Sequence, residues 1–199
     1  MKKKEIVYFK ILNDFIEKKK NSFTQLELSK EMNLSLSVIN SAVKKLEEIG
    51  AVKILNRSFK LIDLKKALYF LASIRNLSKD IIFKIRIETS VREIEKIMPA
   101  GVIFTGYSGF KFKYNYVPAD YSEVYVYANE SELNEIKRRI TKDFKTKTQN
   151  PNFFVIKKNI LIEKYKRISD IFLFVDIWNM KEWYASDFIK ELENKLFKN

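Results

Sequence analysis

Residues 34–52 read Leu-Ser-Leu-Ser-Val-Ile-Asn-Ser-Ala-Val-Lys-Lys-Leu-Glu-Glu-Ile-Gly-Ala-Val, and this stretch decides the fold of the first part of the chain. Its apolar residues recur every three or four positions, a spacing that predicts an amphipathic helix beginning at Leu36. Ser35 is a candidate N-cap, because its hydroxyl can accept a hydrogen bond from a free backbone N–H of the first turn. Gly50 suits the position that follows the end of the helix.

The flanking sequence predicts two further helices and a hairpin. Residues 4–20 carry apolar side chains at helical spacing, and Thr24 with Glu27 three residues later predicts a capping box at the start of a second helix. Beyond the quoted stretch, 52–55 and 59–62 alternate as strands and are joined by a tight turn. The predicted order is therefore helix, short helix, turn, helix and hairpin.

This part of the chain resembles winged helix-turn-helix regulators. The resemblance covers Thr24 to Ile62, and three motifs carry it: Gln25-x-x-Leu28-Ser29, Leu34-Ser-x-Ser-x-Ile39 and Val43-x-x-Leu46-Glu-x-x-Gly50-Ala-Val52. The last motif, in which the third helix passes into the first wing strand, is the most specific of the three. The resemblance implies that the third helix enters the major groove of duplex DNA.

The exposed start of the third helix has the chemistry of a DNA-reading surface. Its hydroxyl, amide and ammonium groups suit phosphate oxygens and base edges, and no carboxylate occurs before Glu47. A helix start without acids favours phosphate docking, and the alternative is a solvated polar face on a small helical domain. The wing tip offers one cation, Arg57, and is otherwise a simple hairpin tip. We expect DNA contact from Thr24, Gln25, Ser35, Leu36, Ser37, Asn40, Ser41, Lys44, Lys45, Arg57, Ser58 and Lys60.

Composition narrows the function classes further. The chain has 199 residues, with 38 Lys and Arg against 25 Asp and Glu, and a formal net charge of +13. This balance favours a polyanionic partner, although a Lys-rich, thermophile-like composition would produce the same excess. The absence of Cys and His excludes disulfides, thiol nucleophiles, imidazole bases and the usual zinc sites. We expect no cofactor and no metal.

Hydropathy gives an expectation for location. No stretch approaches the roughly 18 uninterrupted apolar residues that a spanning helix requires. The segment Met1-Lys-Lys-Lys lacks the apolar core of a signal peptide. We expect a cytoplasmic protein with no membrane partner.

Three segments are expected: a winged-helix DNA-binding domain at 1–62, a connecting helix at 63–79 and a second domain at 80–199. The connecting helix, with Asp63 as a candidate N-cap, is apolar over more of its surface than one domain can cover. Winged-helix regulators usually bind two-fold symmetric sites as dimers. We therefore expect this helix to form the interface of a homodimer, and the alternative is a helix that packs between domains.

The second domain is expected to be α/β or α+β, with one sheet and helices packed on it. Residues 153–156 and 160–162 are predicted to form a hairpin. Asp176 lies on an otherwise apolar helix, so we expect it to be buried with a structural hydrogen bond to backbone or to a Lys. We expect Trp178 and Trp183 to be core residues rather than ligand-stacking residues.

This second half resembles the minimal nucleotidyltransferase-like domain of AbiEi-type antitoxins and related archaeal transcriptional regulators, in which a winged helix precedes such a domain. Three segments carry the resemblance: Thr105-Gly-Tyr-Ser-Gly-Phe, Tyr121-Ser-x-Val-Tyr-Val-Tyr127 and Asp170-Ile-Phe-Leu-Phe-Val-Asp176-Ile-Trp178-Asn179. The two resemblances together imply an α+β chain, in which an N-terminal winged helix-turn-helix is followed by a minimal nucleotidyltransferase-like α/β domain.

Active nucleotidyltransferases hold divalent metal with two carboxylates placed two positions apart on one strand. In this chain Glu123 supplies at most one of that pair, and Tyr125 occupies the second position. We therefore expect no catalytic residues and no enzymatic activity. Thr105, Tyr107, Ser108, Glu123 and Tyr125 are candidates for a degenerate pocket that binds a nucleotide or another small effector.

The sequence thus predicts a sequence-specific DNA-binding transcriptional regulator, with an antitoxin-type repressor as one form of it. Its second domain would serve dimerisation, a protein partner or a small effector. Two alternatives stay open. One is an active metal-dependent nucleotidyltransferase that uses Ser108, Glu123 and a distant acid and is guided by the winged helix. The other is a protein-interaction module whose winged helix has lost DNA binding.

Overall fold

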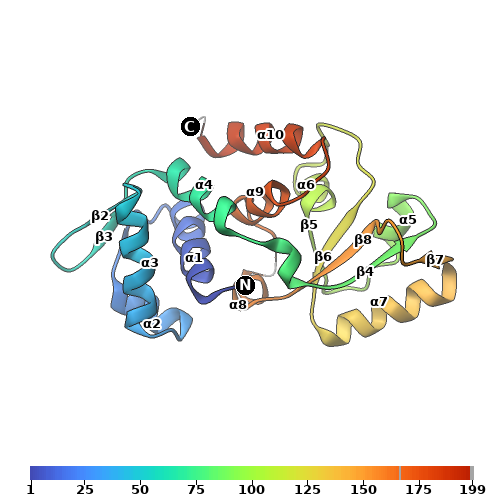
Figure 1. Ribbon diagram of the computed structural model, residues 1–199, viewed down its shortest axis with the longest axis horizontal. Helices are drawn as coiled ribbons and strands as arrows, with labels where there is room; N and C mark the ends of the chain where they lie inside the picture. Colours follow the sequence, from blue (N-terminus) through green and yellow to red (C-terminus); the bar gives the residue numbers. More distant parts are fainter. Residues whose placement is uncertain (166, 198–199) are drawn as a thin grey trace. The chain divides into compact units, whose positions relative to one another are not determined.

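Two units follow one another along the chain, which the computed structural model describes at residues 1–165 and 167–197 (Figure 1). The first unit is Met1–Arg75 and the second is Asn76–Asn199. The boundary lies inside the segment 63–79 that the sequence assigns to a connecting helix. That helix ends at Ile74 within the first unit, and a separate short 3-10 helix opens the second unit.

The first unit combines helices with a small antiparallel sheet. Its elements are α1 (Lys3–Lys18), β1 (Ser22–Phe23), α2 (Gln25–Met32), α3 (Leu36–Glu48), β2 (Val52–Ile54), β3 (Phe59–Leu61) and α4 (Leu64–Ile74). The sheet order β1-β3-β2 places the hairpin β2–β3 beside β1. The predicted order of helices and hairpin is present, and β1 is an addition whose two residues are too few to show an alternating pattern.

Side-chain caps fix where two of these helices begin. Thr24 Oγ1 accepts a hydrogen bond from the backbone N–H of Glu27 at 3.1 Å, and Ser35 Oγ accepts one from Val38 at 3.4 Å. Both N-caps are those that the sequence predicts. The Glu27 carboxylate, predicted to complete a capping box, instead forms an ion pair with Lys20.

Buried charges connect α1 to α2 and to the end of α4. The Lys10 ammonium forms ion pairs with Asp14 on its own helix and with Glu31 of α2, the latter at 2.5 Å. Arg75 Nη1 lies 3.2 Å from the Glu5 carboxylate, and both side chains are at most 3% exposed. A buried ion pair contributes little net stability, but removing one partner costs about 3–5 kcal/mol because the other charge stays buried.

The Lys10 network also sets the pKa values of its carboxylates. Burial raises the pKa of Asp14, but hydrogen bonds from Lys10 and Lys18 outweigh burial and hold that pKa below its ordinary value. A hydrogen bond from Lys10 lowers the pKa of Glu31. Because these folded-state pKa values are lowered, the resulting stability is present above the ordinary carboxyl pKa and is lost as the pH falls through the lowered values.

The second unit is built on one mixed sheet. Its elements are η1 (Leu77–Asp80), β4 (Ile81–Ile87), α5 (Val91–Lys96), β5 (Ile103–Thr105), α6 (Gly106–Tyr114), β6 (Val124–Ala128), α7 (Glu130–Asp143), β7 (Thr146–Lys147), β8 (Phe153–Lys157), α8 (Ile160–Tyr165), α9 (Asp170–Trp178) and α10 (Ala185–Phe197). The strand order is β5-β6-β8-β4-β7, in which β6 and β8 are parallel and the other neighbours are antiparallel. The chain is therefore α+β, as predicted.

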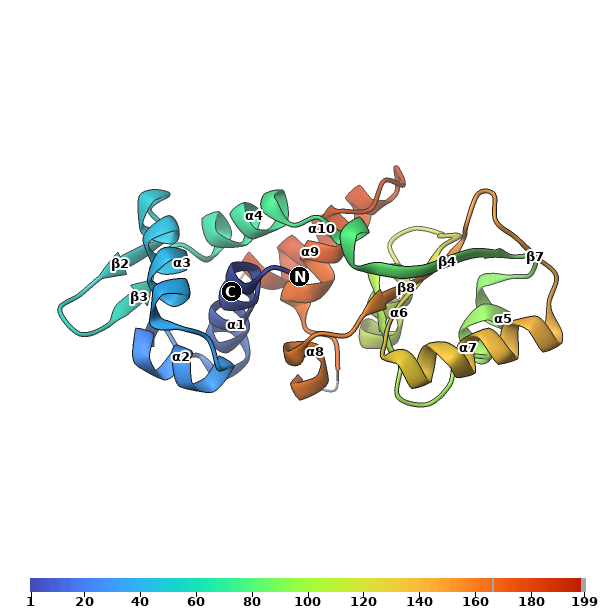
Figure 2. The same cartoon turned by 60° about the horizontal axis from the view of Figure 1, so that its bottom comes forward.

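The central strands carry different side chains on their two faces. One face packs beneath α5 and α7 in a core of Ile87, Ile94, Met98, Val124, Val126, Ala128, Ile136, Ile140, Phe153 and Val155. The opposite face carries Tyr125, Tyr127 and Phe154, and α6 and α9 pack over part of it (Figures 1 and 2). The sheet thus separates an apolar core from a face rich in aromatic side chains.

Two expectations for the second unit are wrong. Residues 160–162 belong to α8 rather than to a hairpin, because the Asn159 side chain accepts hydrogen bonds from Leu161 and Ile162 and starts a helix. Trp178 and Trp183 are 41% and 81% exposed, so neither is a core residue. Both wrong expectations came from apolar patterns read without knowledge of what covers them.

Asp176 is fully buried, as expected, but its partners differ from the predicted ones. The hydroxyl of Thr105 donates a hydrogen bond to Asp176 Oδ2 at 2.7 Å, and the hydroxyl of Tyr127 donates another at 2.8 Å. These bonds tie α9 to β5 and β6.

Among the described residues, no helix is long and apolar enough to cross a membrane.

Replacing Lys10 with Met should destabilise the first unit strongly. The variant removes the cation that pairs with the buried Asp14 carboxylate and with the partly exposed Glu31. Because Asp14 then stays buried with one cation fewer, we expect a loss of about 3–5 kcal/mol at neutral pH. The free energy of unfolding should also fall less steeply as the pH is lowered, because the pKa values of Asp14 and Glu31 return toward their ordinary range. Urea unfolding at several pH values measures both effects. Lys18→Met removes a cation that is 52% exposed and should cost about 0–1 kcal/mol; equal costs for the two variants would contradict this account.

Candidate nucleic-acid interface

The packing of α3 determines which of its side chains reach solvent. Its buried residues are Ile39, Ala42, Val43 and Leu46. Since residues three and four apart share a helix face, the polar residues between them are turned outward. These side chains border a shallow hollow, whose lining residues are Lys4, Ser37, Asn40, Ser41, Lys44, Lys45 and Glu48. The interface therefore presents hydroxyl, amide and ammonium groups on one surface.

Lys4 is a member of this hollow that the sequence analysis missed. It lies in the first turn of α1, far from α3 in the sequence, and joins the surface through the packing of α1 against α3. Its proximity also shows electrostatically, because its charge contributes to lowering the pKa of Glu48. The excess of Lys in residues 2–4 was the one available indication in the sequence.

The amino-terminal turn of α3 carries an exposed apolar group beside the polar ones. Leu36 is 49% exposed at the first position of the helix, and the first turn contains no acid. An apolar side chain at this place can contact the C5 methyl group of thymine. Thr24 and Gln25 at the start of α2 are half-buried, and the Thr24 hydroxyl is already occupied as a cap. Their backbone positions can contact phosphate, but Thr24 has little freedom to read bases.

The wing is short and basic. Leu55 N–H donates to the carbonyl of Ser58 at 2.8 Å and closes the turn, which leaves Arg57 exposed at the tip. Both views show the β2–β3 hairpin projecting beyond α3 (Figures 1 and 2). The register places Lys53 directly opposite Lys60, and both side chains are exposed. Like charges in this position are destabilising, and a bound phosphate would relieve their repulsion.

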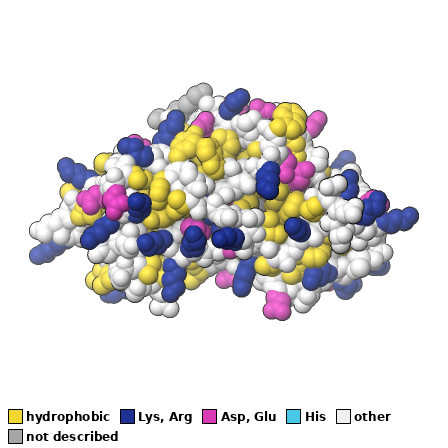
Figure 3. Space-filling model, viewed as in Figure 1, with side chains coloured by type: hydrophobic (Ala, Val, Ile, Leu, Met, Phe, Trp, Pro, Cys, Tyr) yellow, Lys and Arg dark blue, Asp and Glu magenta, His cyan; other side chains and the backbone are white. Residues whose placement is uncertain are grey.

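The cations of the interface differ in how free they are to bind an anion. Lys45 pairs with Glu48 at 2.8 Å, and its hydrogen bond is the main cause of the lowered pKa of that carboxyl. Among the described residues, no carboxylate pairs with the ammonium of Lys44 or with the three basic side chains of the wing. Figure 3 shows one face of the chain, on which Lys and Arg side chains are more widespread than Asp and Glu. Lys44 and the wing are therefore the strongest phosphate candidates.

The structure places the five residues of the predicted second-domain pocket in different surroundings. Thr105 and Ser108 are fully buried, and Thr105 is bound to Asp176. Tyr107 donates a hydrogen bond to Glu182 at 3.0 Å, whereas Glu123 accepts one from Tyr184. Tyr125 lines an open groove, Glu123 lines a separate and smaller hollow, and Thr105, Tyr107 and Ser108 line neither of the two.

Burial is the main influence on the pKa values of this cluster. Desolvation raises the pKa of Tyr107 and of Tyr125, and the nearby Glu182 carboxylate raises both further. Burial also raises the pKa of Glu123, partly offset by the hydrogen bond from Tyr184. Among the described residues, no group of three or more His, Cys, Asp or Glu side chains is placed to hold a metal ion. The cluster has the character of a hydrogen-bonded phenol and carboxyl network.

Comparisons with known proteins bear on the first unit alone. The family model described as winged helix-turn-helix DNA-binding matches residues 9–53, from the middle of α1 to β2. Neither the curated proteins nor the solved structures gave a match. The matched segment contains α2, α3 and the buried residues that orient the exposed face of α3. The amino-terminal unit is a winged helix-turn-helix DNA-binding domain.

Proposed function

We propose that the protein is a sequence-specific transcriptional regulator that reads duplex DNA with α3 and the wing. The observation that carries this proposal is the unpaired basic wing, with Lys53 opposite Lys60, beside the polar face of α3. Two facing lysines cost stability in the free protein and suit a surface that meets an anionic partner, and on a winged helix-turn-helix that partner is the DNA phosphate backbone. Leu36, Ser37 and Asn40 are the candidates for contact with base edges.

We propose that the second unit is a nucleotidyltransferase-like domain that does not catalyse nucleotidyl transfer. The turn from β5 into α6 supports the likeness, because Gly106 has a φ of 59° and a Cβ on Gly109 would lie 2.7 Å from the Phe104 carbonyl. The lack of activity is supported by Tyr125 in place of a carboxylate and by the engagement of Glu123 with Tyr184. Such a unit would serve a protein partner, as in an antitoxin-type repressor, or a small effector.

We infer that two copies of the chain bind DNA together. Ile62 precedes α4 and Ile74 is its last residue, and they are 61% and 39% exposed, so apolar surface is available at that helix. A two-fold dimer would place two α3 helices in successive major grooves, about one helical turn apart. The protein would then select a pseudo-palindromic site.

Removing three polar side chains from α3 should abolish specific binding. Ser37→Ala, Asn40→Ala and Lys44→Ala together delete base-edge and phosphate contacts, and each good base contact is worth about 1–3 kcal/mol. We expect affinity for a site selected from random duplexes to fall by about 100-fold or more. A matched control replaces Ser131, Asn134 and Lys137, which are the same residue types at exposed positions of α7. If the α3 variant binds the selected DNA as tightly as the original protein, the proposal is wrong and a protein-interaction module is favoured.

Changing Lys60 to Glu should separate stability from function. The variant replaces a repulsive pair with an attractive one opposite Lys53, so the unfolding free energy should rise by about 0.2–1 kcal/mol. DNA affinity should fall, and the slope of log affinity against log salt should become shallower by about one. Thermal unfolding and anisotropy titrations at several salt concentrations measure the two effects. A variant that binds DNA as tightly as the original protein would remove the wing from the interface.

Sedimentation tests the dimer. The original protein should sediment as a dimer, and Ile62→Glu with Ile74→Glu should give a monomer, because four buried charges would oppose each interface. Ile160→Glu is the control, since Ile160 is 48% exposed on α8 in the second unit. If the original protein is monomeric in solution and still selects a two-fold site, the two copies meet only on DNA. That result would contradict an interface formed at Ile62 and Ile74.

A further inference from the structure

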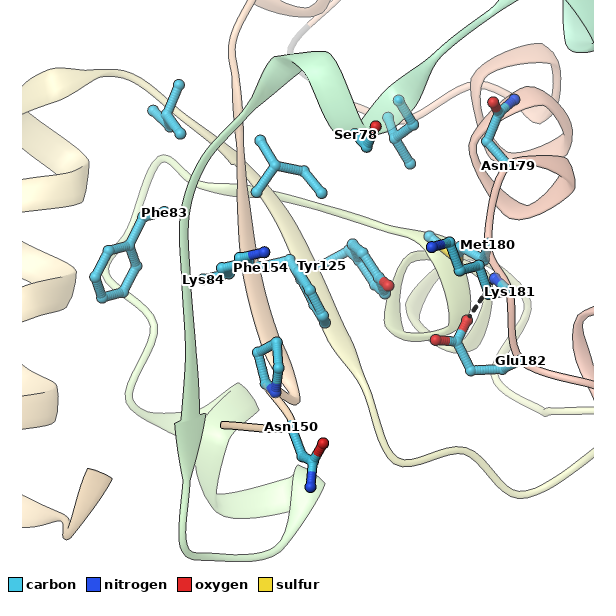
Figure 4. A pocket seen from close by; sticks show the side chains of 14 residues that line it. Ser78, Phe83, Lys84, Tyr125, Asn150, Phe154, Asn179, Met180, Lys181 and Glu182 are labelled. Atoms are coloured by element: carbon cyan, nitrogen blue, oxygen red, sulfur yellow. Dashed lines mark hydrogen bonds between the residues drawn. The ribbon is translucent and has the colours of Figure 1, made fainter. Parts of the chain in front are cut away.

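A groove lies on the aromatic-rich face of the sheet in the second unit, beyond the part that α6 and α9 cover. It is bordered by η1, by β4 and by the segment that follows α9 (Figure 4). Its volume is about 860 Å³, which falls within the range of sites for drug-sized molecules. The residues that matter to its chemistry are Lys84, Tyr125, Asn150, Phe154, Lys181 and Glu182.

The wall of the groove is flat and aromatic. The rings of Tyr125 and Phe154 stack with centroids 4.4 Å apart and planes only 7° from parallel. Tyr125 is 5% exposed, whereas Phe154 on the neighbouring strand is half-buried. Ile82 of β4 lines the same groove and is 44% exposed. A planar ring could therefore extend the stack or lie against this apolar surface.

The charged side chains at the groove differ in whether they are free to bind a ligand. Lys84 and Lys181 lie on opposite sides of the Tyr125–Phe154 pair (Figure 4), and among the described residues neither ammonium has a carboxylate partner. Glu182 is the acid among the lining residues, and it already accepts hydrogen bonds from the Tyr107 hydroxyl and from the backbone N–H of Lys181. The groove thus offers two free cations and one carboxylate, whose Oε2 accepts both of these hydrogen bonds.

We propose that this groove binds a small planar aromatic molecule that carries an anionic group. The ring packs against Phe154 and Ile82, and the anion pairs with Lys84 or Lys181, while the Asn150 amide supplies a neutral hydrogen bond. This inference names a ligand class for the effector role in the proposed function. It concerns binding to the second unit, so its failure leaves the DNA-binding proposal intact.

Calorimetric titration of the full chain without DNA tests the site. The probes are a naphthalene carboxylate, its uncharged carboxamide, a naphthalene methylamine of similar size, and adenosine monophosphate as a phosphate-bearing anion. We expect an anionic probe to bind at least about 10-fold more tightly than the amide or the amine, which corresponds to one charge-assisted contact. A preference for the carboxylate or for the nucleotide identifies which source of anion the groove accepts.

Variants locate the binding. Lys84→Met with Lys181→Met should weaken the anionic probe by about 10-fold or more, and Phe154→Leu should weaken every aromatic probe. Lys190→Met on α10 is the matched control, because it removes a lysine that is 72% exposed and lies outside the groove. Thermal unfolding of each variant confirms that it is folded. Equal affinity for anion, amide and amine, binding that survives the double lysine variant, or no binding at millimolar probe overturns the proposal.

Discussion

The burial of Ile39, Val43 and Leu46, on a helix that packs against α1 and α2, is the constraint on which the first unit depends. Once these side chains are inside, the rotation of α3 about its axis is fixed, and the residues between them have to face solvent. α1 is itself held by charges, through Lys10 to α2 and through Glu5 to Arg75. The surface offered to DNA is therefore an indirect product of contacts made on the other side of the helix.

In the wing, the proposed function and stability make different demands. Its base is secured by the stacked rings of Phe23 and Phe59, whose centroids lie 5.6 Å apart. Its outer surface carries facing lysines that a hairpin selected for stability alone would avoid. Local violations of this kind are expected where a surface has to meet a charged partner, because the partner supplies the missing counter-charges.

The first unit was largely predictable from the sequence, and the second was less so. Ser35 and Thr24 were identifiable because an N-cap depends on residues three positions apart. Lys4 could not be placed at the interface, nor Arg75 beside Glu5, since these pairings join residues that only the tertiary fold brings together. The α8 helix was mistaken for a strand because a run of three apolar residues has no distinguishing period.

The candidate pocket illustrates a further limit. Of the residues predicted from the sequence, Tyr125 lines the groove, but its stacking neighbour Phe154 lies on a parallel strand almost thirty residues away. Thr105 and Ser108 were grouped with it by a motif, yet both side chains are buried inside the unit. A motif gives the order of chemical groups along the chain, whereas the pairing of strands decides which of them share a surface.

The exposure of both tryptophans has an optical consequence. Trp178 and Trp183 are the chain's two tryptophans, and they bracket the segment 179–182 that borders the groove. The first unit has none, so the tryptophan emission of the unlabelled protein comes from the second unit. A change in that emission when duplex DNA is added would therefore report an event at the second unit, either direct contact with the DNA or an effect of binding at the first unit, and it can be followed without a dye.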